Sequence, residues 1–266
     1  MPHVIAIVAP VRDSGKTTAA INLAASLAIL DQKTLLIDCD PAQGVWASAS
    51  LLASTGNSGG FYSVMTDRAA MEAAILPTSL PGLDILPAGA DFSKADFLFE
   101  DTDGDVFRLR DLISRKTAAY DYVIINGPPA EMPGLLGAVL ISSQWLIIPL
   151  RVDMTGSIEL LPWLSGIKNL FNEISIRQKQ LYMSARIIGI LLNRTRPREE
   201  NADGAQEFSI PALENLAGFV FNTRIPMSRE LTEGFSLGKP AAVYHINSDA
   251  AVAFMDLAEE VIQKVS

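Results

Sequence analysis

The 266-residue sequence predicts a doubly wound α/β fold, in which helices cover both faces of a mostly parallel sheet. Short runs of nearly continuous apolar residues recur along the chain, and such runs are typical of strands buried on both faces. Longer segments with apolar residues at helical spacing separate these runs. Because no long linker or internal repeat interrupts the alternation, we expect residues 1–266 to form a single domain.

The predicted strands are the apolar runs themselves. In chain order they are VIAIV at 4–8, TLLID at 34–38, LDILPA at 83–88, YDYVIIN at 120–126, WLIIPL at 145–150, RIIGILLN at 186–193 and the weaker GFVF at 218–221. The apolar spacing between them predicts helices over 16–31, 105–118, 157–172, 206–217 and 249–264.

The composition limits the classes of protein to which the chain can belong. The net charge is −9 and the pI about 4.8, which disfavours nucleic-acid binding unless a local basic patch overrides the average. No stretch approaches the ~20 apolar residues that span a bilayer, and the N-terminus lacks the charged start of a secretory signal. The lone Cys39 suits a reducing compartment. We therefore expect a cytoplasmic protein.

The last predicted helix offers no membrane anchor. It places Val252, Met255, Leu257, Ala258 and Ile262 mainly along one side, and the opposite side is acidic. A helix that lies on a membrane surface needs lysines and arginines on its polar side. We expect this helix to pack against the core and the protein not to bind membranes.

The carboxyl ends of the predicted strands indicate where a ligand binds, because doubly wound sheets bind ligands at that edge. These ends lie at 9–17, 38–44, 126–129, 149–156 and 193–198. They carry most of the unusual side-chain chemistry in the chain, so we expect one site there.

The first of these ends has the context of a phosphate-binding loop, in which a strand leads through a tight loop into a helix. Backbone N–H groups of the loop and helix start would hold phosphate oxygens, Lys16 would neutralise them, and the Thr17 hydroxyl would contact Mg²⁺. The strict motif requires glycine where the chain has Pro10, so a capped surface turn with an exposed lysine is the alternative. The candidate phosphate-binding residues are Arg12, Asp13, Ser14, Gly15, Lys16, Thr17 and Thr18.

Longer stretches identify a family. The segment GKTTAAINLAASLAILDQKTLLIDCDPAQG resembles the opening of the ParA/MinD/Soj family of deviant Walker ATPases, a branch of the P-loop NTPases. Further matches, in the family's order and spacing, are LDILPAG, YDYVIINGPP, IIPLRVDMTGSIELL, IIGILLNR and TRIPMSRELTEGFSLGKPAAVY. The resemblance covers nearly the whole chain. It implies ATP and Mg²⁺ as cofactors, an ATP-dependent homodimer, and slow ATP hydrolysis stimulated by a protein partner.

The loop departs from the family pattern K-G-G-x-G-K-T. The family's signature lysine, which reaches the partner's phosphates across the dimer, falls on Val11, and the two glycines fall on Arg12 and Asp13. Two arginines are candidates to replace that lysine: Arg12 beside it, and Arg151 at a strand end on the same edge. A solvated arginine at a loop start is the alternative for Arg151. ParA relatives that position carboxysomes and lack this lysine resemble the chain in this respect.

The resemblance also assigns roles to three polar residues at strand ends. It implies that Asp38 lies near the hydration shell of Mg²⁺ and that Asp40 positions the attacking water. Asn126 stands where the family has the Walker B aspartate. An amide oxygen accepts a hydrogen bond from a metal-bound water but carries no charge, so the affinity for Mg²⁺ should fall. A polar turn made by Asp40 and Pro41 is the alternative for the aspartates.

The resemblance further implies a base site. Asn193 matches the position whose side chain reads the adenine edge, and Pro226 matches a segment beside the base. An asparagine that caps a strand end is the alternative for Asn193. Non-specific DNA binding stays open, because Arg229 lies beside Glu230, where the family often has arginine.

Three functions remain open on these grounds. The first is an ATP-controlled dimerisation switch that positions or segregates a DNA or protein cargo. The second is a catalytically silent nucleotide-binding adaptor, favoured by Val11 and Asn126. The third is a metabolic enzyme of the dethiobiotin-synthetase type, which DCDPAQG and FSLGKPAAVY disfavour because they resemble the partitioning branch.

Overall fold

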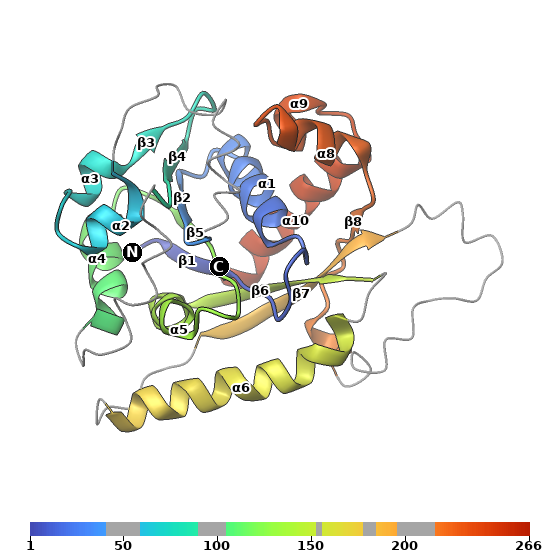
Figure 1. The fold of residues 1–266 in the computed structure, drawn as a ribbon. Helices are drawn as coiled ribbons and strands as arrows, with labels where there is room; N and C mark the ends of the chain where they lie inside the picture. Colours follow the sequence, from blue (N-terminus) through green and yellow to red (C-terminus); the bar gives the residue numbers. More distant parts are fainter. Residues whose placement is uncertain (41–58, 90–104, 153–155, 178–184, 196–215) are drawn as a thin grey trace.

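The computed structural model describes residues 1–40, 59–89, 105–152, 156–177, 185–195 and 216–266. Its centre is an eight-stranded sheet in the order β3-β4-β2-β5-β1-β6-β7-β8 (Figure 1). Neighbouring strands are parallel except β3 and β4, which pair antiparallel. The strands are β1 (His3–Ile7), β2 (Thr34–Asp38), β3 (Leu76–Pro77), β4 (Leu83–Leu86), β5 (Tyr122–Asn126), β6 (Trp145–Arg151), β7 (Arg186–Thr195) and β8 (Ile225–Pro226). The predicted fold class is confirmed.

Helices cover both faces of this sheet. They are α1 (Lys16–Ile29), α2 (Gly60–Met65), α3 (Met71–Ala74), α4 (Arg108–Lys116), α5 (Pro133–Ser142), α6 (Gly156–Arg177), α8 (Arg229–Ser236), α9 (Ala241–Tyr244) and α10 (Asp249–Val265). Short 3-10 turns form η4 (Asp105–Phe107) and η6 (Ala217–Phe219). Side chains of α1 and α10 pack in the core on one face, and those of α2 to α5 pack in the core on the other.

The alternation of a buried strand explains the two cores. Val4 and Ala6 of β1 pack in the core with α2 to α5, whereas Ile5 and Ile7 pack in the core with α1 and α10. Both faces of the strand are therefore apolar, as its continuous apolar sequence predicts. The long helix α6 covers β6 and β7, where Leu160 contacts the third buried cluster.

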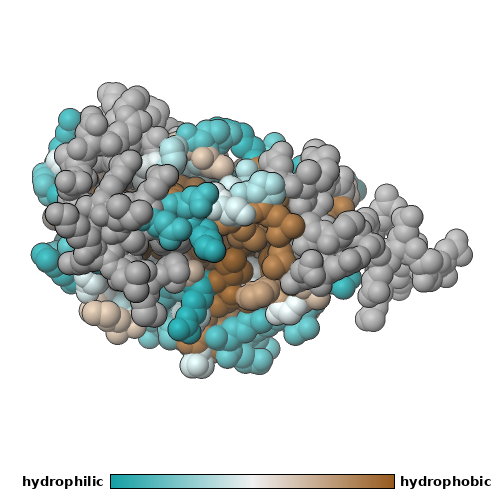
Figure 2. All heavy atoms as spheres, turned by 90° about the horizontal axis from the view of Figure 1, so that it is seen from below, coloured by the Kyte–Doolittle hydropathy of each residue, from teal (hydrophilic) through white to brown (hydrophobic). Residues whose placement is uncertain are grey.

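The view from below shows a strip of hydrophobic residues bordered by hydrophilic ones (Figure 2). Some large apolar side chains remain exposed in the structure, including Leu161 of α6, which is 47% exposed. Among the described residues, no helix has both the length and the apolarity that crossing a membrane requires.

The predicted strand over 218–221 is wrong. Residues Ala217–Phe219 form a 3-10 turn, and only Val220 makes an isolated bridge, to Ile190. The Phe221 ring occupies the space beside Gly189, where a Cβ would lie 2.0 Å from the ring. The apolar run thus serves to insert a side chain into the core rather than to add a strand. The predicted helix over 206–217 lies almost entirely outside the described residues.

The last helix packs against the core as predicted, but its buried side differs from the predicted one. Leu257 and Ala258 are buried, whereas Val252 is 50% exposed. The buried residues of α10 are Ala250, Ala251, Ala253, Phe254, Leu257, Ala258, Val261 and Val265. The small residues at its start, Ala250 and Ala251, pack with Ala241 and Ala242 of α9 in a further buried cluster.

Candidate functional site

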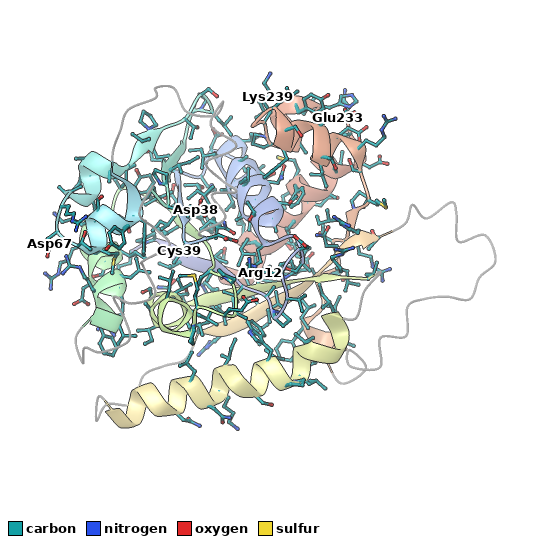
Figure 3. The ribbon with its side chains drawn as sticks, viewed as in Figure 1. Arg12, Asp38, Cys39, Asp67, Glu233 and Lys239 are labelled. Atoms are coloured by element: carbon teal, nitrogen blue, oxygen red, sulfur yellow. The ribbon has the colours of Figure 1, made fainter. Side chains whose placement is uncertain are left out.

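The strand register brings the carboxyl ends of β2, β5 and β1 together. Asn126 pairs with Asp38 of β2 on one side and with Ile7 of β1 on the other. The backbone N–H of Cys39 then donates to the Asn126 carbonyl over 2.9 Å. Figure 3 labels Asp38 and Cys39 at the end of β2 and Arg12 in the loop after β1.

Gly127 lets the chain leave β5 close to β1. Its N–H donates to the Ile7 carbonyl over 3.0 Å, and a Cβ at this position would lie 2.6 Å from that oxygen. A larger residue would therefore push the segment after β5 away from the loop that follows β1. The predicted convergence of strand ends depends on this close approach.

The loop between β1 and α1 has the backbone of an anion site. Gly15 has a φ of 96° at the N-cap of α1, and Asp13 has a φ of 56°. Aspartate is among the residues that tolerate this left-handed region, so Asp13 adopts a conformation that would otherwise favour glycine. Loss of the family's glycine therefore does not prevent a tight loop here.

Lys16 is the first residue of α1, and its side chain is only 6% exposed. Burial lowers the pKa of Lys16, although the nearby Asp40 carboxylate raises it in part. A buried ammonium at a helix N-terminus gains from a bound anion, because the helix dipole favours negative charge at the same place. Lys16 is therefore not the exposed surface lysine that the alternative interpretation requires.

The metal side of the site is a cluster of three side chains. The Asn126 amide donates from Nδ2 to Asp38 Oδ1 over 2.8 Å and to Thr17 Oγ1 over 3.4 Å. Asp38 Oδ1 also accepts from the backbone N–H of Asp40 over 3.2 Å. Asp38 and Asn126 are both fully buried. Three of the residues predicted around Mg²⁺ thus lie in direct contact.

The oxygens Ser14 Oγ and Asn126 Oδ1 are buried in this region and have no hydrogen-bond partner within the described part of the chain. Buried polar atoms are nearly always paired, so an unpaired one indicates where a ligand belongs. A serine hydroxyl donates to an anion, and an amide oxygen accepts from water on a cation. The residues therefore fit a phosphate group beside a hydrated divalent cation.

That cation would need oxygen ligands from water or from the bound anion itself. Across the described ranges, no group of three or more His, Cys, Asp or Glu side chains is placed to hold a metal ion. Mg²⁺ commonly keeps several waters and binds through one or two protein oxygens plus phosphates. Cys39 is not a candidate metal ligand. Complete burial raises the pKa of its thiol, and the negative charges of Asp38 and Asp40 raise it further, so the thiolate that binds metals is disfavoured.

The opposite wall of the loop comes from β6, β7 and β8. Arg151 of β6 pairs with Asn193 of β7, and Asn193 pairs with Ile225, the neighbour of Pro226. The Asn193 amide donates from Nδ2 to the Ser14 carbonyl over 3.0 Å. The structure thus brings Asn193 against the phosphate-binding loop, and it places Arg151 and Pro226 at adjoining strand ends.

Glu131 contacts a candidate residue of the site, although it was not among the residues predicted from the sequence. Its Oε1 accepts from Arg12 Nε over 3.2 Å, and both side chains are largely exposed. A hydrogen bond from its own backbone lowers the pKa of Glu131 the most, and the positive charges of Arg12 and Lys16 lower it further. The position of Glu131, a few residues after the end of β5, was the available signal.

Comparisons with known proteins agree on the family. The family model of an AAA domain matches residues 2–187. The chromosome partitioning protein ParA of Myxococcus xanthus is 31% identical over 255 residues, which cover 94% of this chain and 84% of that protein. The sporulation initiation inhibitor protein Soj of Bacillus subtilis is 30% identical over 266 residues, with 98% of both chains covered.

A solved structure supports the same architecture. The septum site-determining protein MinD of Pyrococcus horikoshii, complexed with Mg-ADP, superposes with a TM-score of 0.71. The match covers 98% of this chain and 96% of that one at 23% sequence identity. This likeness shows a shared fold.

Proposed function

Because this chain belongs to the ParA/MinD family of ATPases, we propose that it is a ParA-like switch that dimerises on ATP and positions or segregates a DNA or protein cargo. The observation that carries the proposal is the buried Lys16 at the start of α1, beside the Thr17, Asp38 and Asn126 cluster. Since strands from residue 3 to residue 226 share one sheet, we infer that the chain acts as one nucleotide-binding domain.

The phosphates of ATP would lie against the loop after β1. Backbone N–H groups from Asp13 to Thr18 would bind the phosphate oxygens, and the Lys16 ammonium would neutralise the charge that develops as the terminal phosphate leaves. The unpaired Ser14 hydroxyl supports this position, since it needs an acceptor. Arg12 is the exposed cation nearest the place of the missing signature lysine.

Mg²⁺ would be held through Thr17 Oγ1 and, by way of water, Asp38 and Asn126. When bound, the ion would offset the negative charge of the phosphate oxygens. Asp38 accepts hydrogen bonds from Asn126 and from the Asp40 backbone, which fix the position of the carboxylate. Asp40 would position the attacking water, and slow hydrolysis would be stimulated by a protein partner.

Arg151 would contact the phosphates across the dimer, in place of the lysine that Val11 has replaced. Its pairing with Asn193 puts it at the same edge of the sheet as the loop. In size-exclusion chromatography, we expect a shift to dimer with ATP but not with ADP. The Arg151→Ala variant should lose that shift, whereas Arg115→Ala on α4 should keep it. Normal ATP-dependent dimerisation of Arg151→Ala would refute the role of Arg151.

A catalytically silent adaptor is the second candidate, and Asn126 favours it because the amide brings no charge to the metal. The two candidates differ in turnover. Steady phosphate release with Mg-ATP, abolished in Lys16→Ala, supports the switch. Tight retention of ATP without phosphate release supports the adaptor.

Replacing Glu131 by glutamine should raise the affinity for ATP up to about fivefold, since exposed ion pairs contribute at most about 1 kcal/mol. The carboxylate now holds Arg12 and lies near Lys16, so it competes with the triphosphate for both cations. Isothermal titration calorimetry measures the change. Glu72→Gln is the control, because it removes a similar pair with Lys116 away from the loop. Unchanged or weaker ATP binding in Glu131→Gln contradicts the competition.

Non-specific DNA binding is proposed only as a property of the ATP-bound form. In residues 216–266 the carboxylates outnumber the cations: the former are Glu230, Glu233, Asp249, Asp256, Glu259 and Glu260, and the latter are Arg224, Arg229, Lys239 and Lys264. A basic strip that binds DNA would therefore need Arg194 of β7 together with Arg196 and Arg198, and the last two lie outside the described residues. Binding at low salt that falls steeply as salt rises supports it, and no binding at low salt with ATP removes it.

A further inference from the structure

Both the side chain and the backbone carbonyl of Asn193, near the end of β7, form hydrogen bonds. Its Nδ2 donates to the Ser14 carbonyl over 3.0 Å, and its Oδ1 accepts from the backbone N–H of Arg194 over 2.8 Å. Its own carbonyl accepts from the N–H of Val152 over 3.2 Å. The side chain is buried, and the hydrogen bond to Ser14 joins residues 179 positions apart in the chain.

The contact between this amide and the loop is a close one. A Cβ on Gly15 would lie 2.0 Å from Asn193 Nδ2, a separation that real atoms do not adopt. The amide therefore occupies the space that any other residue at position 15 would need. Arg194 has a φ of 58°, a left-handed conformation that arginine seldom adopts and that aligns its N–H with Asn193 Oδ1.

From this geometry we propose that Asn193 is a positioning residue for the phosphate site: it clamps the Ser14–Gly15 peptide and so orients a backbone N–H toward the phosphates. The proposal rests on the proposed function, and it differs from the reading of adenine that the family resemblance assigns to this position.

The planarity of the peptide bond links the clamp to the phosphates. In a trans peptide the C=O of one residue and the N–H of the next point in opposite directions. Because Asn193 fixes the Ser14 carbonyl, the N–H of Gly15 points away from Asn193. Backbone N–H groups with fixed directions bind phosphate more strongly than groups that must first be ordered, because the cost of ordering is already met.

Three ligands separate a phosphate role from a base role: ATP, GTP and inorganic tripolyphosphate. We expect Asn193→Ala to weaken the binding of all three by a similar factor of about fivefold to thirtyfold, since it removes the buried hydrogen bond to the Ser14 carbonyl and frees the loop. Asn222→Ala is the matched control, because the side chain of Asn222 donates to Glu260 on the surface. Unchanged tripolyphosphate binding, or a loss confined to ATP, overturns the proposal.

A second measurement tests the clamp without nucleotide. Gly15→Ala should lower the melting temperature less in the Asn193→Ala background than in the wild type, because the atom that the new methyl group meets is gone. Equal losses in the two backgrounds refute the clamp. If Asn193→Ala does not fold, Asn193→Leu keeps the volume and removes the hydrogen bonds. If the wild type binds neither ATP nor tripolyphosphate, the proposed function is refuted. The comparison of melting temperatures between the two backgrounds still tests the clamp in that case.

Discussion

Lys16→Met is expected to weaken ATP binding by about thirtyfold or more while the protein without nucleotide becomes no less stable. The side chain is 6% exposed, so the ammonium gives up most of its hydration in the folded chain. Removing it takes away a buried charge that lies against the phosphates, and such charges contribute about 2–5 kcal/mol to binding. The same removal relieves the cost of burying that charge before a ligand binds.

The buried Lys16 should also make the stability of the protein depend on pH in a definite direction. Burial lowers the pKa of Lys16 below its ordinary value of 10.5, so the unfolded chain binds the proton more tightly than the folded one. The free energy of unfolding should therefore rise with pH from the lowered pKa up to about 10.5 through this group. Lys16→Met should lack that rise, and urea unfolding of the two proteins from pH 7 to pH 10 measures the difference.

A matched lysine keeps the test specific. Lys33, just before β2, is exposed and lies outside the loop after β1, so Lys33→Met should leave ATP affinity unchanged. If Lys16→Met binds ATP as the wild type does, the loop after β1 is not a phosphate site.

Asn126→Asp should destabilise the protein by about 3–5 kcal/mol at neutral pH without metal. The Asn126 amide now donates to Asp38 Oδ1 over 2.8 Å, with both side chains fully buried. A second carboxylate would replace that donor by a like charge, and the pKa of one member of the pair would rise. The loss should thus be smallest at acid pH and grow as the pH rises through the raised pKa.

Mg²⁺ with ATP should reverse this loss, because a divalent cation neutralises the paired carboxylates. Thermal unfolding at two pH values, with and without Mg-ATP, measures both effects. Asn222→Asp provides the control, since it makes the same change beside the Glu260 carboxylate on an exposed loop. Equal stability of Asn126→Asp and the wild type without metal contradicts the contact with Asp38.

The sequence predicts most strands of the sheet because each buried parallel strand is a short, continuous run of apolar residues. Buried strands need apolar residues on both faces, so β1, β2, β5, β6 and β7 stand out as continuous runs. Helix α5 has the same continuous apolarity and no helical period, which is why the pattern did not reveal it. Helices α3 and α9 are too short for a period to be seen. The 218–221 run failed because Phe221 fills space beside Gly189, a packing demand between distant residues.

The candidate site likewise contains residues that the sequence pattern predicts and residues whose contacts depend on distant parts of the chain. The ends of parallel strands must meet, so the sequence pattern predicts that Lys16, Asp38 and Asn126 share one edge, and the strand register pairs Asp38 with Asn126 there. The sequence pattern could not reveal the ion pair of Glu131 with Arg12, because that pair depends on the path of the chain after Gly127. Nor could it foresee that Asp13 would take a left-handed conformation in place of a glycine.

The sheet order also determines when the site can form during synthesis. β1 is made first, yet it lies between β5 and β6, so one of its edges stays unpaired until residue 126 has been made and the other until residue 147 has been made. Pairing between segments so distant in the chain is slow and leaves apolar surface exposed in the meantime. Because Ser14 is bound by Asn193, the loop after β1 reaches its final shape only once β7 has left the ribosome.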